Sequence, residues 1–345
     1  MILIALAAVL AACGQSPKGS GREKLAGAGA TFPLPYYNLA FKTYRDSVPA
    51  EVSYGGIGSG GGIRSLKDRI VDFAGSDAYL TDAEMAAMPD SVIHIPTCMG
   101  AVVMAYNLPG VEKLKLTGEL VADIYLGKIT RWNDARIRGI NPGVQLPDLE
   151  IHPVYRSDGS GTTFVFSDYL TKVSPAWKET IGAGKSLEWP AGLAAKGNPG
   201  ISGTVSQTEG AVGYIGSEYA FAQHISYASL QNKAGRFIDP TLESISAAAA
   251  GDLPTDTRCM ITDPDAADAY PISCFTWILL YKEQGYDKRT REQSEALVDL
   301  LGWMLGSQAQ DLAGKVNYAP LPQQVIDNGR AQLGTVTYKG EKLLK

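Results

Sequence analysis

Residues Arg156 to Thr162 read RSDGSGT, and this stretch is the most informative in the chain. An apolar run from Ile151 to Tyr155 precedes it, and an apolar-periodic run from Thr162 to Leu170 follows it. This order predicts a strand, a tight glycine-rich turn and the start of a helix. A helix start offers unpaired N–H groups and the positive end of the helix dipole, so it is a ready site for an anion.

Three side chains of this turn would strengthen such a site. The hydroxyls of Ser160 and Thr162 and the guanidinium of Arg156 can converge on one point, and Asp158 can hold that guanidinium in a bidentate pair. An ordinary capped loop explains the same residues, because Asp-Gly and Ser-Gly are common turn formers. The turn taken alone leaves both interpretations open.

Two further glycine-rich segments favour the anion site. Gly27 to Pro33 reads GAGATFP, and Gly55 to Gly62 reads GGIGSGGG. Each carries a hydroxyl, at Thr31 and Ser59 respectively, and each precedes a predicted helix, over residues 34–44 and 63–70. Glycine lets a backbone approach a ligand closely and form the amide nests that bind oxyanions. The three turns together predict a site lined by neutral donors and one arginine.

The remaining pattern alternates strands with helices. Strands are expected over residues 51–54, 71–75 and 92–107, and helices over residues 120–125 and 294–305. Thr81 and Glu84 form a capping box at the start of a helix that extends to Met88. Such alternation predicts an α/β fold with covered sheets, in which ligands bind outside the carboxyl ends of strands.

Length and composition limit the classes of function. A chain of 345 residues suits two domains, and 45% hydrophobic with 19% charged residues is normal for a globular protein. The net charge of −5 and the lack of a Lys/Arg run exclude a basic nucleic-acid surface. An anionic ligand must therefore be captured by local geometry rather than by long-range attraction.

The N-terminus has the pattern of a targeting segment. Ile2 to Ala12 is continuously apolar, too short to span a bilayer but suited to a signal peptide. The sequence LAAC, ending at Cys13, resembles a bacterial lipoprotein signal: residues 1–12 would be removed and Cys13 lipidated. Residues 13–24 would then form a flexible tether. The alternative is a chance apolar leader with ordinary cleavage.

Three cysteines lie beyond the proposed signal. Cys259 and Cys274 flank a polar loop and could face each other across paired strands, whereas Cys98 lies in an apolar stretch and suits a buried position. An odd count leaves at least one free thiol, and the spacing does not decide which. The three histidines, His94, His152 and His224, lack metal-ligand spacing and are expected to be structural.

Six motifs in order resemble those of a known family, the phosphate-binding protein of the bacterial phosphate-specific ABC transporter. They are GAGATFP, YGGIGSGGG, VDFAGSD, DIYLGKITRWND, RSDGSGT, and WPAGLAAKGNPG with GAVGYIG. The resemblance covers nearly all of the chain after residue 25. It implies a two-lobed α/β periplasmic-binding-protein fold, type II-like, with the ligand in the cleft between the lobes. Residues 25–98 and 274–345 would form the first lobe and residues 99–273 the second, with hinge crossings near both ends.

The resemblance also implies a ligand set. The expected phosphate contacts are Thr31, Phe32, Ser59, Asp77, Arg156, Ser160, Gly161 and Thr162, of which Phe32 and Gly161 would contribute backbone N–H groups, with Asp158 in support. Relatives often carry a second serine where this chain has Gly60, which would remove one donor near the site. The implied partners are inorganic phosphate and the permease subunits of the transporter. The implied protein is a monomer without cofactor, metal or enzymatic activity, facing the periplasm on its lipid anchor.

Asp77 is the residue that would set selectivity. A carboxylate facing an anion is unfavourable unless the anion brings a proton to share. Phosphate carries one near neutral pH, with a pKa of roughly 6–7 by analogy with phosphomonoesters, and sulfate does not. We therefore expect Asp77 to stay ionised, to accept a protonated phosphate oxygen and to exclude sulfate. The alternative is that Asp77 belongs only to the turn before Thr81.

Other classes of function have less support in the sequence. A phosphatase using Ser160 or Asp77 as nucleophile would need a general base or a metal cluster, and neither is evident. The residues around Ser160 do not form a GxSxG elbow, and Glu179 stands where a P-loop ending at Ser186 needs its first glycine. A surface or adhesion protein would not require Asp77. Sulfate and molybdate remain alternative ligands for a binding protein.

Overall fold

The computed structural model describes residues 23–344, and its elements alternate between strands and helices. The strands are β1 (Glu23–Gly29), β2 (Ala50–Gly56), β3 (Phe73–Ser76), β4 (Val92–Tyr106), β5 (Leu114–Leu116), β6 (His152–Arg156), β7 (Leu193–Ala195), β8 (Ala211–Gly216), β9 (Ala228–Gln231), β10 (Phe237–Ile238), β11 (Ser273–Tyr281), β12 (Thr337–Tyr338) and β13 (Glu341–Lys342). The helices are α1 (Leu34–Ser47), α2 (Ser59–Lys67), α3 (Asp82–Ala86), α4 (Gly118–Tyr125), α5 (Ala135–Ile140), α6 (Gly161–Val173), α7 (Pro175–Thr180), α8 (Gly197–Gln207), α9 (Ser217–Gln223), α10 (Leu242–Ala247), α11 (Arg291–Met304), α12 (Ser307–Lys315) and α13 (Gln323–Leu333). The predicted lipidation site, Cys13, and the predicted signal and most of the tether lie outside the described residues.

One long sheet runs through the molecule in the strand order β2-β1-β3-β11-β4-β8-β6-β7. Strands β1, β2 and β3 are mutually parallel at one end, and β6, β7 and β8 are parallel at the other. Between them, β4 and β11 are antiparallel to each other and to their outer neighbours. The parallel ends need helical crossovers, which is why helices cover the faces of the sheet.

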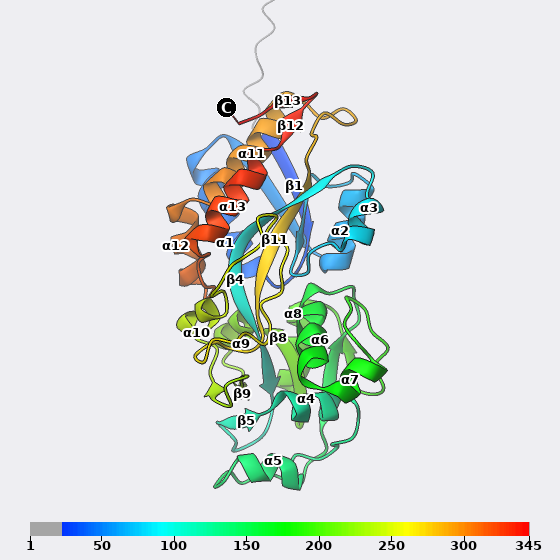
Figure 1. The fold of residues 1–345 in the computed structure, drawn as a ribbon. Coiled ribbons are helices and arrows are strands. Elements are labelled where there is room, and N and C mark those ends of the chain that lie inside the picture. The colour runs from blue at the N-terminus through cyan, green and yellow to red at the C-terminus, as the bar shows by residue number, and fades with distance from the viewer. Residues whose placement is uncertain (1–22, 345) are drawn as a thin grey trace, which may run out of the picture.

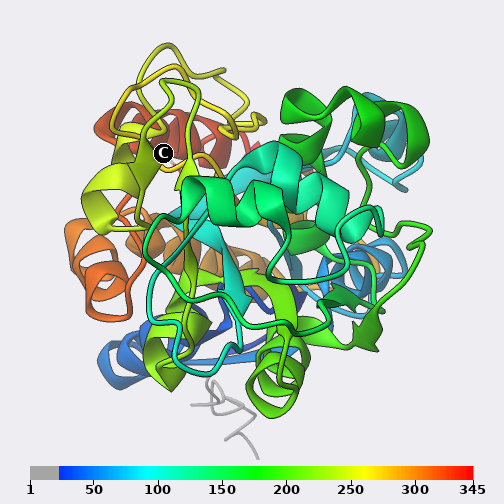
Figure 2. The same ribbon diagram turned by 90° about the horizontal axis from the view of Figure 1, so that it is seen from below.

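The elements gather into two groups along the long axis of the molecule (Figure 1). The first group contains β1 to β3 with α1, α2, α3 and α11 to α13, and the second contains β6 to β8 with α4 to α9. Strand β4 belongs to both: residues 92–101 pair with β11, and residues 102–106 pair with β8. A view along the axis shows helices around the strands on several sides (Figure 2).

Local sequence explains most of the element boundaries. The predicted capping box at α3 is present, with the Glu84 N–H donating to the Thr81 hydroxyl and the Glu84 carboxylate accepting from the Thr81 N–H. The predicted start of α2 is wrong: the helix begins at Ser59 rather than at Ile63, so the glycines form its first turn. Glycine is a poor helix former, and these positions are helical because of the close tertiary approach described below.

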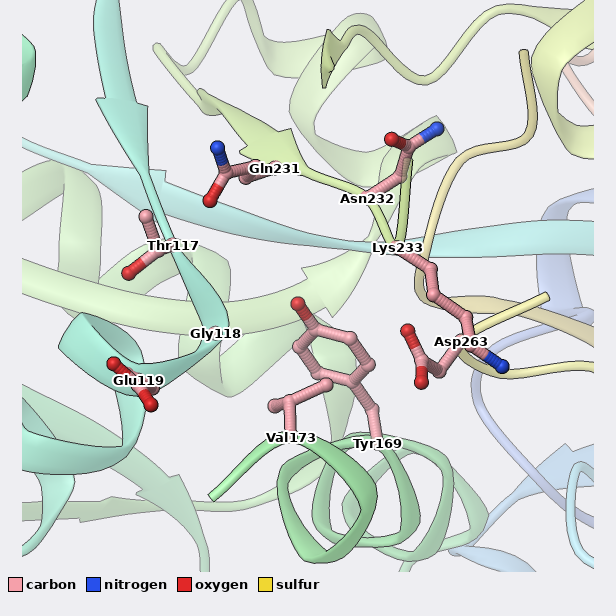
Figure 3. Close-up of a pocket in the computed structure, with 9 residues that line it drawn as sticks. All are labelled: Thr117, Gly118, Glu119, Tyr169, Val173, Gln231, Asn232, Lys233 and Asp263. Carbon is pink, nitrogen blue, oxygen red and sulfur yellow. The ribbon is translucent and has the colours of Figure 1, made fainter. Parts of the chain in front are cut away.

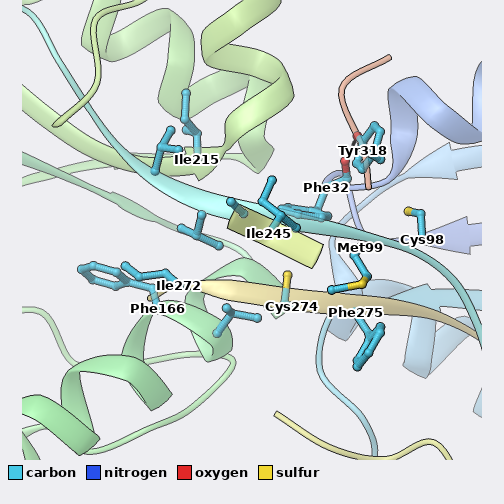
Figure 4. Packing of buried hydrophobic residues seen from close by; sticks show 14 of the residues in the cluster. Phe32, Cys98, Met99, Phe166, Ile215, Ile245, Ile272, Cys274, Phe275 and Tyr318 are labelled. Atoms are coloured by element: carbon cyan, nitrogen blue, oxygen red, sulfur yellow. Dashed lines mark hydrogen bonds between the residues drawn. The ribbon is translucent and has the colours of Figure 1, made fainter. Parts of the chain in front are cut away.

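A core of buried apolar side chains continues between the two groups (Figure 4). Phe32 and Tyr318 pack edge to face with their ring centroids 5.9 Å apart. Gly100 in β4 lies under Phe32, and a Cβ there would come within 2.4 Å of the ring. The tight contact shows why β4 carries a glycine at this point.

The structure decides between the alternatives for the cysteines. Cys98, Cys259 and Cys274 are all free thiols. The expectation that Cys259 faces Cys274 across paired strands is wrong, because Cys259 lies outside any strand and Cys274 pairs with Gly100. Cys98 is fully buried, as its apolar surroundings predict.

Candidate anion-binding site

The RSDGSGT turn connects β6 to α6, as predicted. Ser160 is the N-cap of α6, and its hydroxyl accepts a hydrogen bond from the Thr163 N–H at 3.0 Å. The Arg156 guanidinium forms the predicted bidentate pair with Asp158, from Nε to Oδ1 at 2.7 Å and from Nη2 to Oδ2 at 2.5 Å. The Arg156 side chain is 1% exposed. A buried, oriented cation therefore lies at the start of a helix.

Asp158 is held as the partner of this cation. Burial raises the pKa of Asp158, but hydrogen bonds from Arg156 and from the Gly197 N–H outweigh that effect and leave the pKa below its usual value. Asp158 is thus ionised at neutral pH. It binds the Nε and Nη2 atoms of Arg156 but not Nη1, which instead lies 3.4 Å from Thr162 Oγ1.

The GAGATFP segment brings Thr31 and Phe32 to the same place from the first group. Thr31 Oγ1 accepts hydrogen bonds from the Asn198 N–H and from Asn198 Nδ2, both at 3.0 Å. The Phe32 ring is buried in the core, and its N–H donates to no other described residue. That N–H lies two residues before α1, and the family resemblance implies it as a ligand contact.

The first turn of α2 contacts the RSDGSGT turn directly. The Gly161 N–H donates to Ser59 Oγ at 3.1 Å, and the Gly60 N–H donates to the Gly159 carbonyl at 2.8 Å. A Cβ on residue 60 would lie 3.1 Å from the Gly159 Cα. Gly60 therefore lets the two turns approach, which gives a structural reason for the departure from a second serine.

Asp77 follows β3 and is buried beside these groups. Thr276 Oγ1 donates to its Oδ1 at 2.6 Å, and a Cβ on Gly161 would lie 2.8 Å from its Oδ2. Burial raises the pKa of Asp77 to about 7, against the lowering effects of Thr276, Arg156 and Thr162. A pKa of about 7 makes the ionised form of Asp77 predominant only above pH 7, whereas the sequence prediction was a carboxylate that stays ionised.

All the predicted site residues converge. The side chains of Thr31, Ser59, Asp77, Arg156, Ser160 and Thr162 are each 5% exposed or less, and Phe32 and Gly161 lie among them. Groups from both ends of the sheet contact one another in this cluster. The arrangement offers hydroxyl and N–H donors, one cation and one carboxyl to a small tetrahedral anion.

Sequence reasoning missed two residues of this cluster. Thr276 in β11 bonds Asp77, and Asn198 at the start of α8 bonds Thr31 and Thr162. Asn198 stands in the quoted motif WPAGLAAKGNPG, so its position was visible although its partners were not. Thr276 gave no local signal, because its partner is distant in the sequence.

A second buried carboxyl lies close to the site. Glu218 in α9 is 3% exposed, and neither of its oxygens has a hydrogen-bond partner among the described residues. Burial, with the nearby Asp77, raises the pKa of Glu218 well above its usual value. The neighbouring Tyr318 hydroxyl donates to the Phe32 carbonyl instead. Glu218 is therefore expected to be a neutral acid in the closed protein.

Replacing Glu218 with glutamine should change the pH dependence of stability. Because the folded-state pKa is raised, the stabilising contribution of Glu218 is fully present below its unfolded value, roughly 4.3, and is lost as pH rises towards the folded pKa. The wild type should lose up to about 1.4 kcal/mol per pH unit in this window relative to Glu218→Gln. Urea unfolding of the phosphate-free protein between pH 4.5 and 9 measures the difference.

Glu84 provides the control for this measurement. Its pKa is lowered, since the hydrogen bonds from Lys185 and Thr81 outweigh the effect of burial. Glu84 is therefore ionised in both the folded and the unfolded protein above about pH 6, and Glu84→Gln should have a constant effect from there to pH 9. A constant difference for Glu218→Gln as well would contradict a neutral Glu218.

A separate cavity of about 250 Å³ lies away from this cluster (Figure 3). It is lined by Thr117, Tyr169 and Lys233, among others, and by none of the predicted site residues. No arginine borders it. The predicted anion contacts thus lie in the buried cluster rather than around this cavity.

The described residues contain neither a membrane-spanning helix nor a metal-binding cluster. Between residues 23 and 344, no helix is both long and apolar enough to cross a bilayer. Over the same residues, no group of three His, Cys, Asp or Glu side chains is arranged to hold a metal ion.

Comparison with known proteins agrees with this geometry. A family model described as a PBP superfamily domain matches residues 14–308. The chain is 40% identical over 308 residues to the phosphate-binding protein PstS of Xylella fastidiosa, an alignment that covers 88% of this chain and 83% of that protein. The chain belongs to the PstS family. It is also 39% identical over 318 residues to PstS of Pasteurella multocida, covering 91% of this chain and 90% of the relative.

Solved structures support the fold of a PstS-family protein. The periplasmic phosphate-binding protein PfluDING, solved with bound phosphate, superposes with a TM-score of 0.73 at 21% identity, covering 89% of this chain and 93% of that one. A phosphate-binding protein from Stenotrophomonas maltophilia superposes with a TM-score of 0.70. The predicted two-lobed α/β periplasmic-binding-protein fold is therefore confirmed.

Proposed function

We propose that this PstS-family protein captures inorganic phosphate in the cell envelope and delivers it to the permease subunits of an ABC importer. The observation that carries the proposal is the buried cluster itself, in which Arg156, paired with Asp158, lies beside hydroxyl and N–H donors from both groups of elements. The names of its relatives PstS agree with phosphate as the ligand.

On phosphate binding, protein donors that now bond one another would instead donate to the phosphate oxygens. The Gly161 N–H, now bonded to Ser59 Oγ, would donate to a phosphate oxygen, and the freed Ser59 hydroxyl would donate to another. The Phe32 N–H and Arg156 Nη1 would add further donors. Asp77 would accept the phosphate hydroxyl, which a fully deprotonated oxyanion cannot offer.

We infer that the two groups of elements move as lobes. Residues 25–98 with 274–345 would form one lobe and residues 99–273 the other, joined where β4 and β11 cross. Thr31, Ser59 and Asp77 then face Arg156 and Thr162 across the cleft. Phosphate would contact both sides and shift the equilibrium towards the closed form.

The site supports binding rather than turnover. A buried cluster of donors with a carboxyl that faces the ligand holds a protonated anion, but it supplies no separate base to activate water. We therefore propose that the protein is not an enzyme, needs no cofactor and acts as a monomer. With a net charge of −5, capture depends on local donors rather than on a basic field.

We also propose that Cys13 anchors the protein by a lipid, with residues 13–24 as the tether. Cys13→Ser should release the protein from the membrane fraction while leaving phosphate affinity unchanged, because anchor and site are far apart in the chain. Fractionation with phosphate titration of the released protein measures both. Retention of Cys13→Ser in membranes, together with an unacylated wild type, would contradict the anchor.

Calorimetric titration of residues 14–345 with phosphate, arsenate and sulfate tests the proposed function. Phosphate and arsenate, which carry a proton at neutral pH, should bind, and sulfate should bind much more weakly at pH 8.5. Absence of phosphate binding, or sulfate binding as strong as phosphate binding, would overturn the assignment.

A further inference from the structure

Asn198 is fully buried between the two groups of elements, and each of its side-chain polar atoms has a partner. Oδ1 accepts a hydrogen bond from the Gly216 N–H at 3.0 Å. A backbone N–H can only donate, so this bond fixes which end of the amide is oxygen. The NH₂ group must therefore face Thr31 and Thr162, as the structure has it.

Asn198 occupies the lone pairs of the Thr31 hydroxyl. Thr31 Oγ1 accepts two bonds from it, one from the backbone N–H and one from Nδ2, both at 3.0 Å. A hydroxyl has two lone pairs and one hydrogen. With both lone pairs in use, Thr31 has only its hydrogen left, and that hydrogen can only be donated.

Both lone pairs of the Thr162 hydroxyl are also used as acceptors. Its Oγ1 accepts from Asn198 Nδ2 at 3.3 Å and from Arg156 Nη1 at 3.4 Å. Both bonds are long, but both come from groups that cannot accept, so no alternative direction exists for them. One amide therefore leaves a hydroxyl on each side of the site with only its hydrogen to donate. For Thr162 the Asp77 carboxyl is an acceptor within reach, so a bound anion would take this hydrogen from Asp77 or share it.

We propose that Asn198 is a positioning residue of the anion site, which fixes the hydroxyls of Thr31 and Thr162 as hydrogen-bond donors towards the ligand. The inference rests on the proposed function and adds a determinant of affinity that itself need not touch the anion. Hydroxyls free to rotate would have to be ordered by each anion that binds, whereas these two are ordered beforehand.

A double-mutant cycle with inorganic phosphate tests the inference. Asn198→Ala should weaken phosphate binding by roughly 100-fold, about ten-fold for each hydroxyl whose donation is no longer enforced. Thr31→Val with Thr162→Val removes the hydroxyls and should cost a similar factor. Adding Asn198→Ala to that pair should then cost less than about three-fold, because no hydroxyl remains to be oriented.

Asn198→Asp keeps the shape and the acceptor for the Gly216 N–H, so it guards against a misfolded alanine variant. Its second oxygen accepts instead of donating, so both threonines would turn their hydrogens away from the anion. We expect Asn198→Asp to lose more phosphate affinity than Asn198→Ala. In the background with Thr31→Val and Thr162→Val, Asn198→Asp should lose less, because only charge repulsion between the carboxylate and the anion remains.

Asn232 supplies the matched control. It is also buried, and its Nδ2 donates to the Ala267 and Ala269 carbonyls outside the site. Asn232→Ala should lower the midpoint of thermal unfolding without changing phosphate affinity. If the Asn198→Ala loss is the same in both backgrounds, Asn198 only supports the fold and the inference fails while the function stands. If the wild type does not bind phosphate, the function and the inference fail together.

Discussion

Arg156→Ala is expected to weaken phosphate binding by roughly 30- to 5,000-fold, which corresponds to about 2–5 kcal/mol for truncating one partner of a buried charge pair. The guanidinium is almost fully buried and has no other carboxylate partner than Asp158 among the described ion pairs. Its removal would leave Asp158 buried beside the incoming anion. Part of the loss is therefore repulsion from Asp158, in addition to the missing attraction.

Two variants sharpen this prediction. Arg156→Lys should recover only part of the affinity, because an ammonium cannot hold Asp158 by two parallel bonds and also reach Thr162. Arg131 is the matched control, since it pairs with Asp148 on the surface with 49% of its side chain exposed. Arg131→Ala should change the calorimetric dissociation constant less than two-fold, since exposed pairs contribute little. Binding by Arg156→Ala within a few-fold of the wild type would remove Arg156 from the site.

Asp77→Asn is expected to collapse the selectivity for phosphate over sulfate at alkaline pH. With a pKa of about 7, only about 3% of Asp77 is protonated at pH 8.5, so protonating it to admit sulfate costs roughly 30-fold. Sites built around a ligand hydroxyl can discriminate by about 10⁴-fold. At pH 8.5, Asp77→Asn should therefore bind sulfate between about 30-fold and about 10⁴-fold more tightly than the wild type does. Its phosphate affinity should change less.

The pH dependence of sulfate binding isolates the role of the Asp77 proton. In the wild type, sulfate affinity should rise as pH falls through 7, because the carboxyl becomes a neutral donor, by roughly 100-fold from pH 9 to pH 6. In Asp77→Asn the same titration should be nearly flat. A flat wild-type profile, or equal losses of phosphate and sulfate affinity in the variant, would make Asp77 a structural residue of the turn.

The sequence predicted elements whose signals are local. The capping box of α3 and the strand, turn and helix around RSDGSGT depend on residues a few positions apart, and they formed as expected. The start of α2 was misplaced because its first turn contains three glycines, which have low helix propensity, and it contacts the distant RSDGSGT turn through the Gly60 N–H and the Gly159 carbonyl. Predictions from local sequence fail where a contact with a distant part of the chain determines the local structure.

The same distinction explains which site residues were found. Arg156 and Asp158 are two positions apart, so their pairing follows from the turn. Thr276 is 199 positions from Asp77, and Asn198 is 167 positions from Thr31. No spacing rule connects residues across such separations; the strand order must first be known. For the same reason the sequence could not decide how the cysteines are arranged.

Strand β4 is divided between two ladders, one with β11 and one with β8, so neither half of the molecule has a complete sheet without the other. The halves should accordingly lose their structure together, in one cooperative transition rather than two. A ligand held between them then stabilises the entire chain by RT ln(1 + [L]/Kd). The midpoint of thermal unfolding becomes a direct measure of phosphate affinity, even when the probe is a tryptophan far from the anion.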